Sequence, residues 1–283
     1  MDKDFKNAIG SSIHLNSMID IVRAAGDILL LGKKELSSLS TISKTKNPND
    51  ILSKYDLLVQ RYIYSELQNI FPSYKTIGEE EDLGKSETIG NDFVWIIDPI
   101  DGTLNFLMDR SEFSISLALF KHGKPFAGIV YAPARNELYV TEKGKGAFLN
   151  ENKIYVRNTP LTPFPLYHFE LHKINYDKII GNILPMAAHI RRFGGSAALD
   201  LAFVASGKVD AQFSTKLNIW DVAAGVLLVS EAGGICVALD GKEMDFTLKP
   251  NGYSYIAGSK EHVDNIVNKI PRIEANQILN STI

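Results

Sequence analysis

The segment FVWIIDPIDGTLN places two aspartates at the end of an apolar run. Asp98 and Asp101 are separated by a proline and an isoleucine. Two carboxylates this close both ionise cheaply only when a positive charge lies between them. Pro99 fixes its own φ angle and gives the two side chains a defined relation. Oxygen ligands on such a stiff loop suit a hard divalent cation such as Mg²⁺.

The residues around these aspartates add phosphate chemistry to the pattern. The carbonyl oxygen of Ile100 can turn towards the same point, and Gly102 and Thr103 offer backbone N–H groups where a helix can start. A helix N-terminus beside a cation is a natural site for phosphate. The alternative is that Asp98 and Asp101 only cap a turn, because Asp-Gly is a common turn signal. The motif alone leaves both readings open.

Two further acidic motifs lie far from this segment in the sequence. Glu79 and Glu80 follow a glycine at the end of an expected strand, YKTIG. Asp221, in NIWD, stands at the start of an apolar helical stretch. The alternatives are a solvated loop for the glutamates, which we expect for Glu81 and Asp82, and an N-cap for Asp221.

GEE, WIIDPIDGTLNF and WDVAAG…EAGG, in this order, resemble the motifs of the inositol monophosphatase family. Fructose-1,6-bisphosphatases and bisphosphate nucleotidases share the same metal-binding core. The resemblance covers nearly the whole chain, from the first helix to the last. It implies an α+β fold, a layered α-β-α-β-α sandwich of the sugar-phosphatase type. It also implies hydrolysis of a phosphate monoester by Mg²⁺-activated water, with sensitivity to lithium.

The resemblance assigns roles to individual residues. The implied metal ligands are Glu79, Asp98, the carbonyl of Ile100, Asp101 and Asp221. The implied catalytic residues that activate the attacking water are Thr103, Asp56 and Glu79. Glu80 is expected to orient the site. The implied contacts to phosphate and substrate are Asp101, Gly102, Thr103, Gly195, Ser196, Ala197, Ser214 and Asp221.

The chain departs from the family pattern at Ser214. Members that hydrolyse inositol phosphates commonly carry a glutamate seven residues before the aspartate of the WD motif. A short hydroxyl here, with Lys216 close by, is a poorer clamp for a polyol and suits a substrate with additional negative charge. Arg191 and Arg192 could reach a second anionic group or a partner subunit, or could be solvated at a strand end.

The elements that must position these residues follow from periodicity. We expect a helix over 15–31 and a second helix that begins at Ser53, where Ser53-x-x-Asp56 has the form of a capping box. A meander of short strands spans 93–150, and 157–190 forms a junction. The remaining segments alternate: helices 196–206, 221–231 and 260–269, and strands 209–213, 235–239 and 253–258. We therefore expect subdomains over 1–156 and 157–283, and a loosely held tail after Pro271.

Composition narrows the function classes. Lys and Arg total 30 against 33 Asp and Glu, for a net charge of -3, so direct binding of nucleic acid is not expected. The single cysteine, Cys236, excludes a disulfide within the chain and a cysteine-rich zinc site. Charges interrupt the most apolar early stretch, so no membrane span is expected. These features indicate a soluble cytoplasmic protein.

The six histidines do not form a metal site. His168 and His172 have helical spacing, but the segment PLYHFELH alternates like a strand. We expect all six in surface or satisfied polar positions.

The substrate remains open at this level. The main hypothesis is a Mg²⁺-dependent phosphatase for inositol monophosphate or a related sugar or polyol phosphate, acting as a homodimer. The alternatives are a phosphatase for a nucleotide 3′-phosphate, NADP, histidinol phosphate or fructose bisphosphate, or a regulatory binding protein on the same fold.

Overall fold

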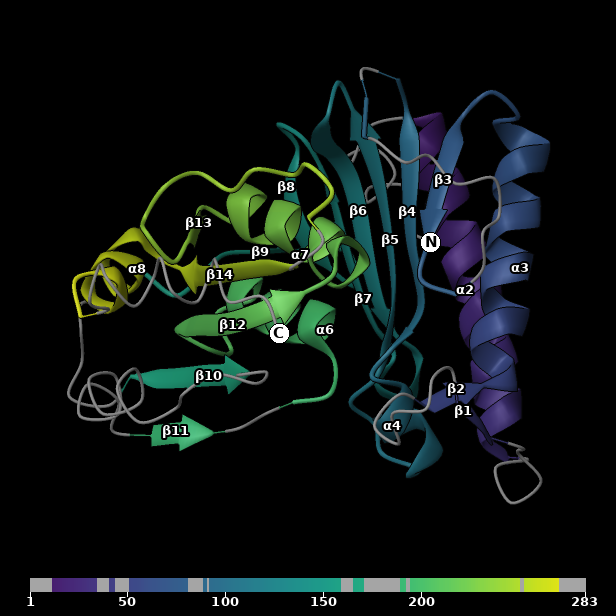
Figure 1. Ribbon diagram of the computed structural model, residues 1–283, viewed down its shortest axis with the longest axis horizontal. Helices are drawn as coiled ribbons and strands as arrows, with labels where there is room; N and C mark the ends of the chain where they lie inside the picture. Colours follow the sequence, from purple (N-terminus) through teal and green to yellow (C-terminus); the bar gives the residue numbers. More distant parts are fainter. Residues whose placement is uncertain are drawn as a thin grey trace.

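The computed structural model describes residues 12–34, 41–43, 51–80, 89–90, 92–158, 165–170, 189–191, 194–249 and 252–269. Within them the chain forms five layers, visible edge-on in Figure 1. Helices alternate with two sheets in the order α-β-α-β-α. The expected α+β sandwich is confirmed.

The larger sheet has seven strands in the order β3-β4-β5-β6-β7-β8-β9. Only β3 and β4 are parallel, and the other neighbours are antiparallel. The strands are β3 (Lys75–Gly78), β4 (Val94–Asp101), β5 (Ser114–Lys121), β6 (Lys124–Ala132), β7 (Glu137–Glu142), β8 (Gly146–Leu149) and β9 (Asn152–Ile154). The predicted meander is therefore present, with β9 as an unpredicted final strand.

Two long helices, α2 (Ile13–Lys34) and α3 (Lys54–Ile70), cover one face of this sheet (Figure 1). Their apolar positions recur every three or four residues, so each helix buries one stripe. Leu15 of α2 and Val59 of α3 are fully buried in the same apolar cluster as Trp95 and Ile97 of β4. Burial of one such side chain stabilises the fold by about 1.5–3 kcal/mol.

The helices α6 (Ala197–Ala205) and α7 (Ile219–Glu231) cover the opposite face and separate the two sheets. A Cβ atom on Gly225 would overlap the Leu201 side chain, so this glycine lets the two helices pack closely. Strands β4 and β5 are thus covered on both faces, which explains their almost unbroken apolar sequence.

The smaller sheet has the order β11-β10-β12-β14-β13 and carries α8 on its outer face. Its strands are β10 (Leu166–Glu170), β11 (His189–Arg191), β12 (Ala211–Leu217), β13 (Ile235–Ala238) and β14 (Tyr253–Gly258), and α8 spans Lys260–Val267. The strand pattern noted around His168 is confirmed as β10. The expected strand 209–213 starts too early, because residues 206–210 form the turn after α6.

Four short elements complete the described fold: β1 (Thr41–Ser43), which pairs with β2 (Ile51–Ser53), then α4 (Thr103–Leu107) and the 3₁₀ turn η2 (Pro133–Arg135). Ser53 ends β2 directly before α3, and its side chain lies outside the described part, as does the tail after Pro271. The predicted division at 156 falls between β9 and β10. Since α6 and α7 pack against both sheets, the two subdomains stay a prediction. No described helix is long and apolar enough to cross a bilayer.

Candidate metal centre and active site

A β-bulge places Asp98 and Asp101 on the same face of the large sheet. Asp98 lies opposite Ser116 of β5 and Asp101 lies opposite Ser114, so β4 has one more residue than β5 over this interval. Side chains normally alternate between the faces of a strand, and a spacing of three would put the two aspartates on opposite faces. The extra residue of the bulge shifts the alternation by one position, so Asp98 and Asp101 lie on the same face of the sheet. Both carboxylates therefore face α6 and α7, while Ile100 is buried towards α2 and α3.

Three carboxylates converge at this point. Asp98, Asp101 and Asp221 each present an oxygen within 4.8 Å of the others. The fold orients each one through a hydrogen bond to one oxygen: the Ile100 N–H donates to Asp98 Oδ1 (3.1 Å). The N–H groups of Ala198 and Asn218 donate to Oδ2 of Asp101 and Asp221 (both 2.6 Å). Asp221 is the N3 residue of the capping box of α7, whose N-cap is Asn218, so the expectation that Asp221 itself is the N-cap is wrong.

Asp98 is the centre of the cluster. It is 1% exposed, and its Oδ2 is buried without a hydrogen-bond partner among the residues that the structure describes. Burial raises the pKa of Asp98 well above its ordinary range, and the nearby charges of Glu79, Asp101, Asp221 and Asp56 raise it further. A buried carboxylate oxygen with no donor, surrounded by other acids, fits a hard divalent cation. The residues present therefore fit the metal that the motifs imply.

Thr103 links the start of α4 to α3. Its hydroxyl lies 3.1 Å from Asp56 Oδ1 and 3.1 Å from the Ile100 carbonyl oxygen, and both can accept its proton. Asp56 is fully buried in the first turn of α3. The structure thus joins Thr103 to Asp56 across 47 residues of sequence, as the predicted water-activating pair requires.

Glu79 and Glu80 directly follow β3. The Glu79 N–H donates to the Ile97 carbonyl (3.2 Å), which continues the pairing of β3 with β4 and places Glu79 beside Asp98. Glu79 is not among the three acids whose oxygens meet within 4.8 Å, although its charge acts on Asp98. The Glu80 N–H donates to Gln60 Oε1 (2.9 Å). Their predicted roles stay predictions. Glu81 and Asp82 lie outside the described residues.

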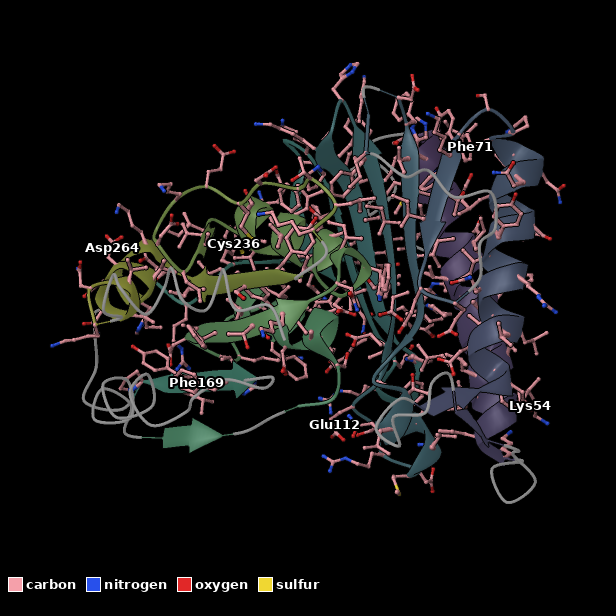
Figure 2. All side chains as sticks on the ribbon, viewed as in Figure 1. Lys54, Phe71, Glu112, Phe169, Cys236 and Asp264 are labelled. Carbon is pink, nitrogen blue, oxygen red and sulfur yellow. The ribbon has the colours of Figure 1, made fainter. Side chains whose placement is uncertain are left out.

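The glycine-rich turn before α6 lies against the loop after Asp101. Gly102 has a left-handed φ of 92°, and a Cβ atom there would overlap the Gly195 carbonyl. Asn105 Nδ2 fixes this contact, because it donates to the carbonyls of Glu112 (2.6 Å) and Gly194 (3.2 Å). Figure 2 shows Glu112 beside α4. The role of Asn105 was not predicted from the sequence. The feature that could have indicated it is the position of Asn105 directly after the DGTL segment.

Ser196 and Ala197 are both 3% exposed. The Ser196 hydroxyl donates to Asp101 Oδ2 (2.8 Å) and accepts from the Leu199 N–H (3.3 Å), so it also caps α6. The expected substrate segment is thus placed beside the acids, and Ser196 has an internal role that the motif did not reveal. Direct contacts of Gly195, Ser196 and Ala197 with substrate stay predictions.

Ser214 lies within β12 and is 0% exposed, with no hydrogen-bond partner for its hydroxyl. It pairs with Glu170 of β10 and Tyr255 of β14, and a register shift follows it before Leu217. Lys216, inside that shift, has a φ of 58°. The described side chains do not include Arg191 or Arg192.

The remaining candidates behave as structural residues. His168 is buried, with Nδ1 3.2 Å from Asp200 Oδ1, whereas His172 lies outside the described residues. Cys236 is partly exposed on β13, and burial of its thiol raises its pKa. Figure 2 shows Cys236 far from Glu112 and therefore from the turn at α4.

A family model for the inositol monophosphatase family matches residues 14–275. The chain belongs to the inositol monophosphatase family. Membership indicates a phosphatase that uses a divalent metal, and the cluster of Asp98, Asp101 and Asp221 could hold one.

Curated relatives of this family carry two kinds of name. The chain is 38% identical over 260 residues to a Nus factor SuhB from Xylella fastidiosa, covering 87% of this chain and 90% of the relative. It is 36% identical over 252 residues to an inositol-1-monophosphatase from Mesorhizobium japonicum, covering 87% and 91%.

Solved structures of the family share the fold closely. An inositol monophosphatase from Thermotoga maritima is 31% identical with a TM-score of 0.80, covering 94% of this chain and 99% of that one. A Staphylococcus aureus enzyme described as inositol monophosphate bound is 25% identical with a TM-score of 0.77, covering 94% and 97%.

Proposed function

We propose that the protein is a Mg²⁺-dependent phosphomonoesterase that hydrolyses inositol monophosphate or a related small sugar or polyol phosphate. The observation that carries the proposal is the convergence of Asp98, Asp101 and Asp221, with one oxygen of Asp98 buried and unpartnered. A ligand set of oxygens alone favours Mg²⁺ over softer metals.

The proposed ligands are Asp98, Asp101, Asp221, Glu79 and the Ile100 carbonyl. When bound there, Mg²⁺ neutralises charge on the phosphoryl oxygens and lowers the pKa of a water molecule. The bulge and the helix N-termini orient the carboxylates before any ligand arrives, so little reorganisation is needed. The backbone N–H groups of Gly102 and Thr103, which directly follow Asp101, are the proposed donors to the phosphate.

Thr103 and Asp56 supply the route for the proton of the attacking water. The water transfers a proton to Thr103 Oγ1 while Thr103 passes its own proton to Asp56 Oδ1, 3.1 Å away. The hydroxide equivalent attacks phosphorus, the bond from phosphorus to the substrate oxygen breaks, and that oxygen leaves as an alcohol with a proton that Asp56 returns through solvent. Asp56 is fully buried, and its carboxylate lies within hydrogen-bond distance of the Thr103 hydroxyl, which makes it the proposed proton acceptor.

A nucleotide substrate is the second candidate. A solved structure of the Staphylococcus aureus enzyme is described as 2′-AMP bound, at 25% identity and a TM-score of 0.74. Ser214, in place of the glutamate common in inositol-hydrolysing members, favours a substrate that does not depend on a polyol clamp. The relatives named Nus factor SuhB raise a further possibility, a regulatory role on the same fold.

A substrate panel distinguishes these functions. Purified protein with Mg²⁺ is offered inositol 1-phosphate, fructose 1,6-bisphosphate, 2′-AMP and adenosine 3′,5′-bisphosphate, and released phosphate is measured with malachite green. We expect hydrolysis of inositol 1-phosphate by the parent protein and none by Asp221→Asn. No phosphate release from any substrate would reject the phosphatase and leave the regulatory role.

A further inference from the structure

Two buried serines of β5 lie directly opposite the two aspartates of β4. Ser114 pairs with Asp101 and Ser116 with Asp98, and both serines face α6 and α7. Each serine reaches a helix on that side. The Ser116 hydroxyl donates to the Trp220 carbonyl in the first turn of α7 (3.1 Å), and the Ser114 Oγ lies 2.9 Å from Ser196 Oγ at the N-cap of α6. Strand β5 thus connects each aspartate to the helix across from it.

The direction of the hydrogen bond between Ser114 and Ser196 follows from counting protons. The Ser196 hydroxyl has one proton, and an ionised carboxylate can only accept, so that proton goes to Asp101 Oδ2. Ser196 then accepts from the Leu199 N–H and has one lone pair left for Ser114. Ser114 must therefore be the donor. The chain of hydrogen bonds runs from Ser114 to Ser196 to Asp101.

We propose that Ser114 is a positioning residue for the metal centre: by donating to Ser196, it fixes the proton that holds Asp101 Oδ2 and so sets the orientation of that carboxylate. This inference rests on the proposed function, because it assigns Asp101 to a Mg²⁺ site. Ser114 is 0% exposed, and its hydroxyl reaches the expected substrate segment through the hydrogen bond to Ser196.

The Ser114 donor matters because it limits the orientations that the Ser196 hydroxyl can adopt. Without the donor, the Ser196 hydroxyl gains an unfilled lone pair and can rotate away from Asp101. The carboxylate would then lose the Ser196 hydrogen bond at Oδ2 and keep the one from the Ala198 N–H. A metal site needs its ligands oriented before binding, and outer hydrogen-bond partners of ligands commonly change metal affinity.

The experiment measures Mg²⁺ binding to the metal-stripped protein by calorimetry. Ser114→Ala removes the donor, and Ser114→Cys is a nearly isosteric second variant with a weak donor. Ser114→Thr keeps the hydroxyl. Thr141→Val is the matched control, because Thr141 is also fully buried in the large sheet and donates to the Gly146 carbonyl (3.1 Å), but has no contact with Asp101.

We expect Ser114→Ala and Ser114→Cys to raise the Mg²⁺ dissociation constant about three- to tenfold, as loss of one neutral hydrogen bond implies. Ser114→Thr should stay within about twofold of the parent, and so should Thr141→Val. If the parent binds Mg²⁺ and Ser114→Ala and Ser114→Cys bind it equally well, this inference is wrong and the proposed function stands. The same conclusion holds if Thr141→Val loses as much Mg²⁺ affinity as the Ser114 variants. A parent that binds no Mg²⁺ overturns the proposed function, and this inference with it.

Discussion

Asp98→Asn should stabilise the metal-free protein. The side chain is buried, one of its oxygens has no donor, and the neighbouring acids repel its charge. Asparagine keeps an oxygen that can accept the Ile100 N–H and removes the charge. Asp98→Asn, which keeps the size of the side chain, should therefore increase the free energy of unfolding of the metal-free protein. The same substitution removes a proposed metal ligand and should abolish activity.

The cluster geometry limits the size of this effect. Two unit charges 4.8 Å apart repel by about 3.5 kcal/mol at an effective dielectric constant of about 20, so two neighbours would cost about 7 kcal/mol. Protonating an ordinary aspartate, with a pKa of about 3.9, costs about 5 kcal/mol at pH 7.5. Keeping Asp98 protonated therefore costs less free energy than keeping it charged beside two other acids. The protonation cost of about 5 kcal/mol is the largest stabilisation that Asp98→Asn can gain. An unpartnered amide group in the variant costs about 1–3 kcal/mol, which leaves a gain of about 2–4 kcal/mol.

The sign of the pH dependence follows from the raised pKa of Asp98. Above pH about 4 the unfolded chain loses a proton that the folded, metal-free protein keeps, so the parent becomes less stable as pH rises through the folded pKa. Asp98→Asn does not titrate, and its advantage grows over the same interval. Urea unfolding in EDTA between pH 5 and 8 measures this difference. Asp264→Asn, at an exposed acid of α8, is the control. A less stable Asp98→Asn at pH 7.5 refutes the reasoning.

Three further predictions concern lithium inhibition, which the family resemblance implies, the residue at position 214, and His14. Millimolar Li⁺ should inhibit Mg²⁺-dependent phosphate release, and unchanged rates in Li⁺ would count against the oxygen-only site. Ser214→Glu should raise kcat/KM for inositol 1-phosphate relative to fructose 1,6-bisphosphate by about tenfold, whereas an unchanged ranking would show that residue 214 does not select the substrate. Burial lowers the pKa of His14, which stacks on Phe71 and Phe93, so this histidine should cost stability as pH falls below 6.5. The loss of urea midpoint caused by lowering the pH from 6.5 to 5 should therefore be smaller in His14→Gln than in the parent or in His122→Asn.

The sequence allowed prediction of the layers, the order of the elements and the acids of the site. Apolar patterning is a local property: α2 and α3 each show it as one buried stripe, whereas β4 and β5 show an almost unbroken apolar run because both of their faces are covered. The DPID segment indicated that two carboxylates act together. It did not reveal how a strand with alternating faces turns both to one side, because the bulge depends on pairing with β5.

The contacts that hold the site could not be predicted because they join distant segments. Ser196 and Asp101 are separated by 95 residues, and Asn105 and Gly194 by 89. Nothing in the local pattern of FSISLALF distinguishes Ser114, which faces the site, from an ordinary polar residue of a strand. Sites of this kind depend on register and helix placement, which a single sequence specifies only through the complete fold.

We propose that the carboxylates of Asp98, Asp101 and Asp221 hold the metal that hydrolysis requires. The most direct test is phosphate release from inositol 1-phosphate by protein stripped with EDTA, before and after Mg²⁺ is returned. We predict no turnover in the stripped protein, recovery with Mg²⁺, and no recovery in Asp98→Asn, although that variant stays folded. Full turnover of the stripped protein in excess EDTA, or recovery of Asp98→Asn to the level of the parent, would contradict the account.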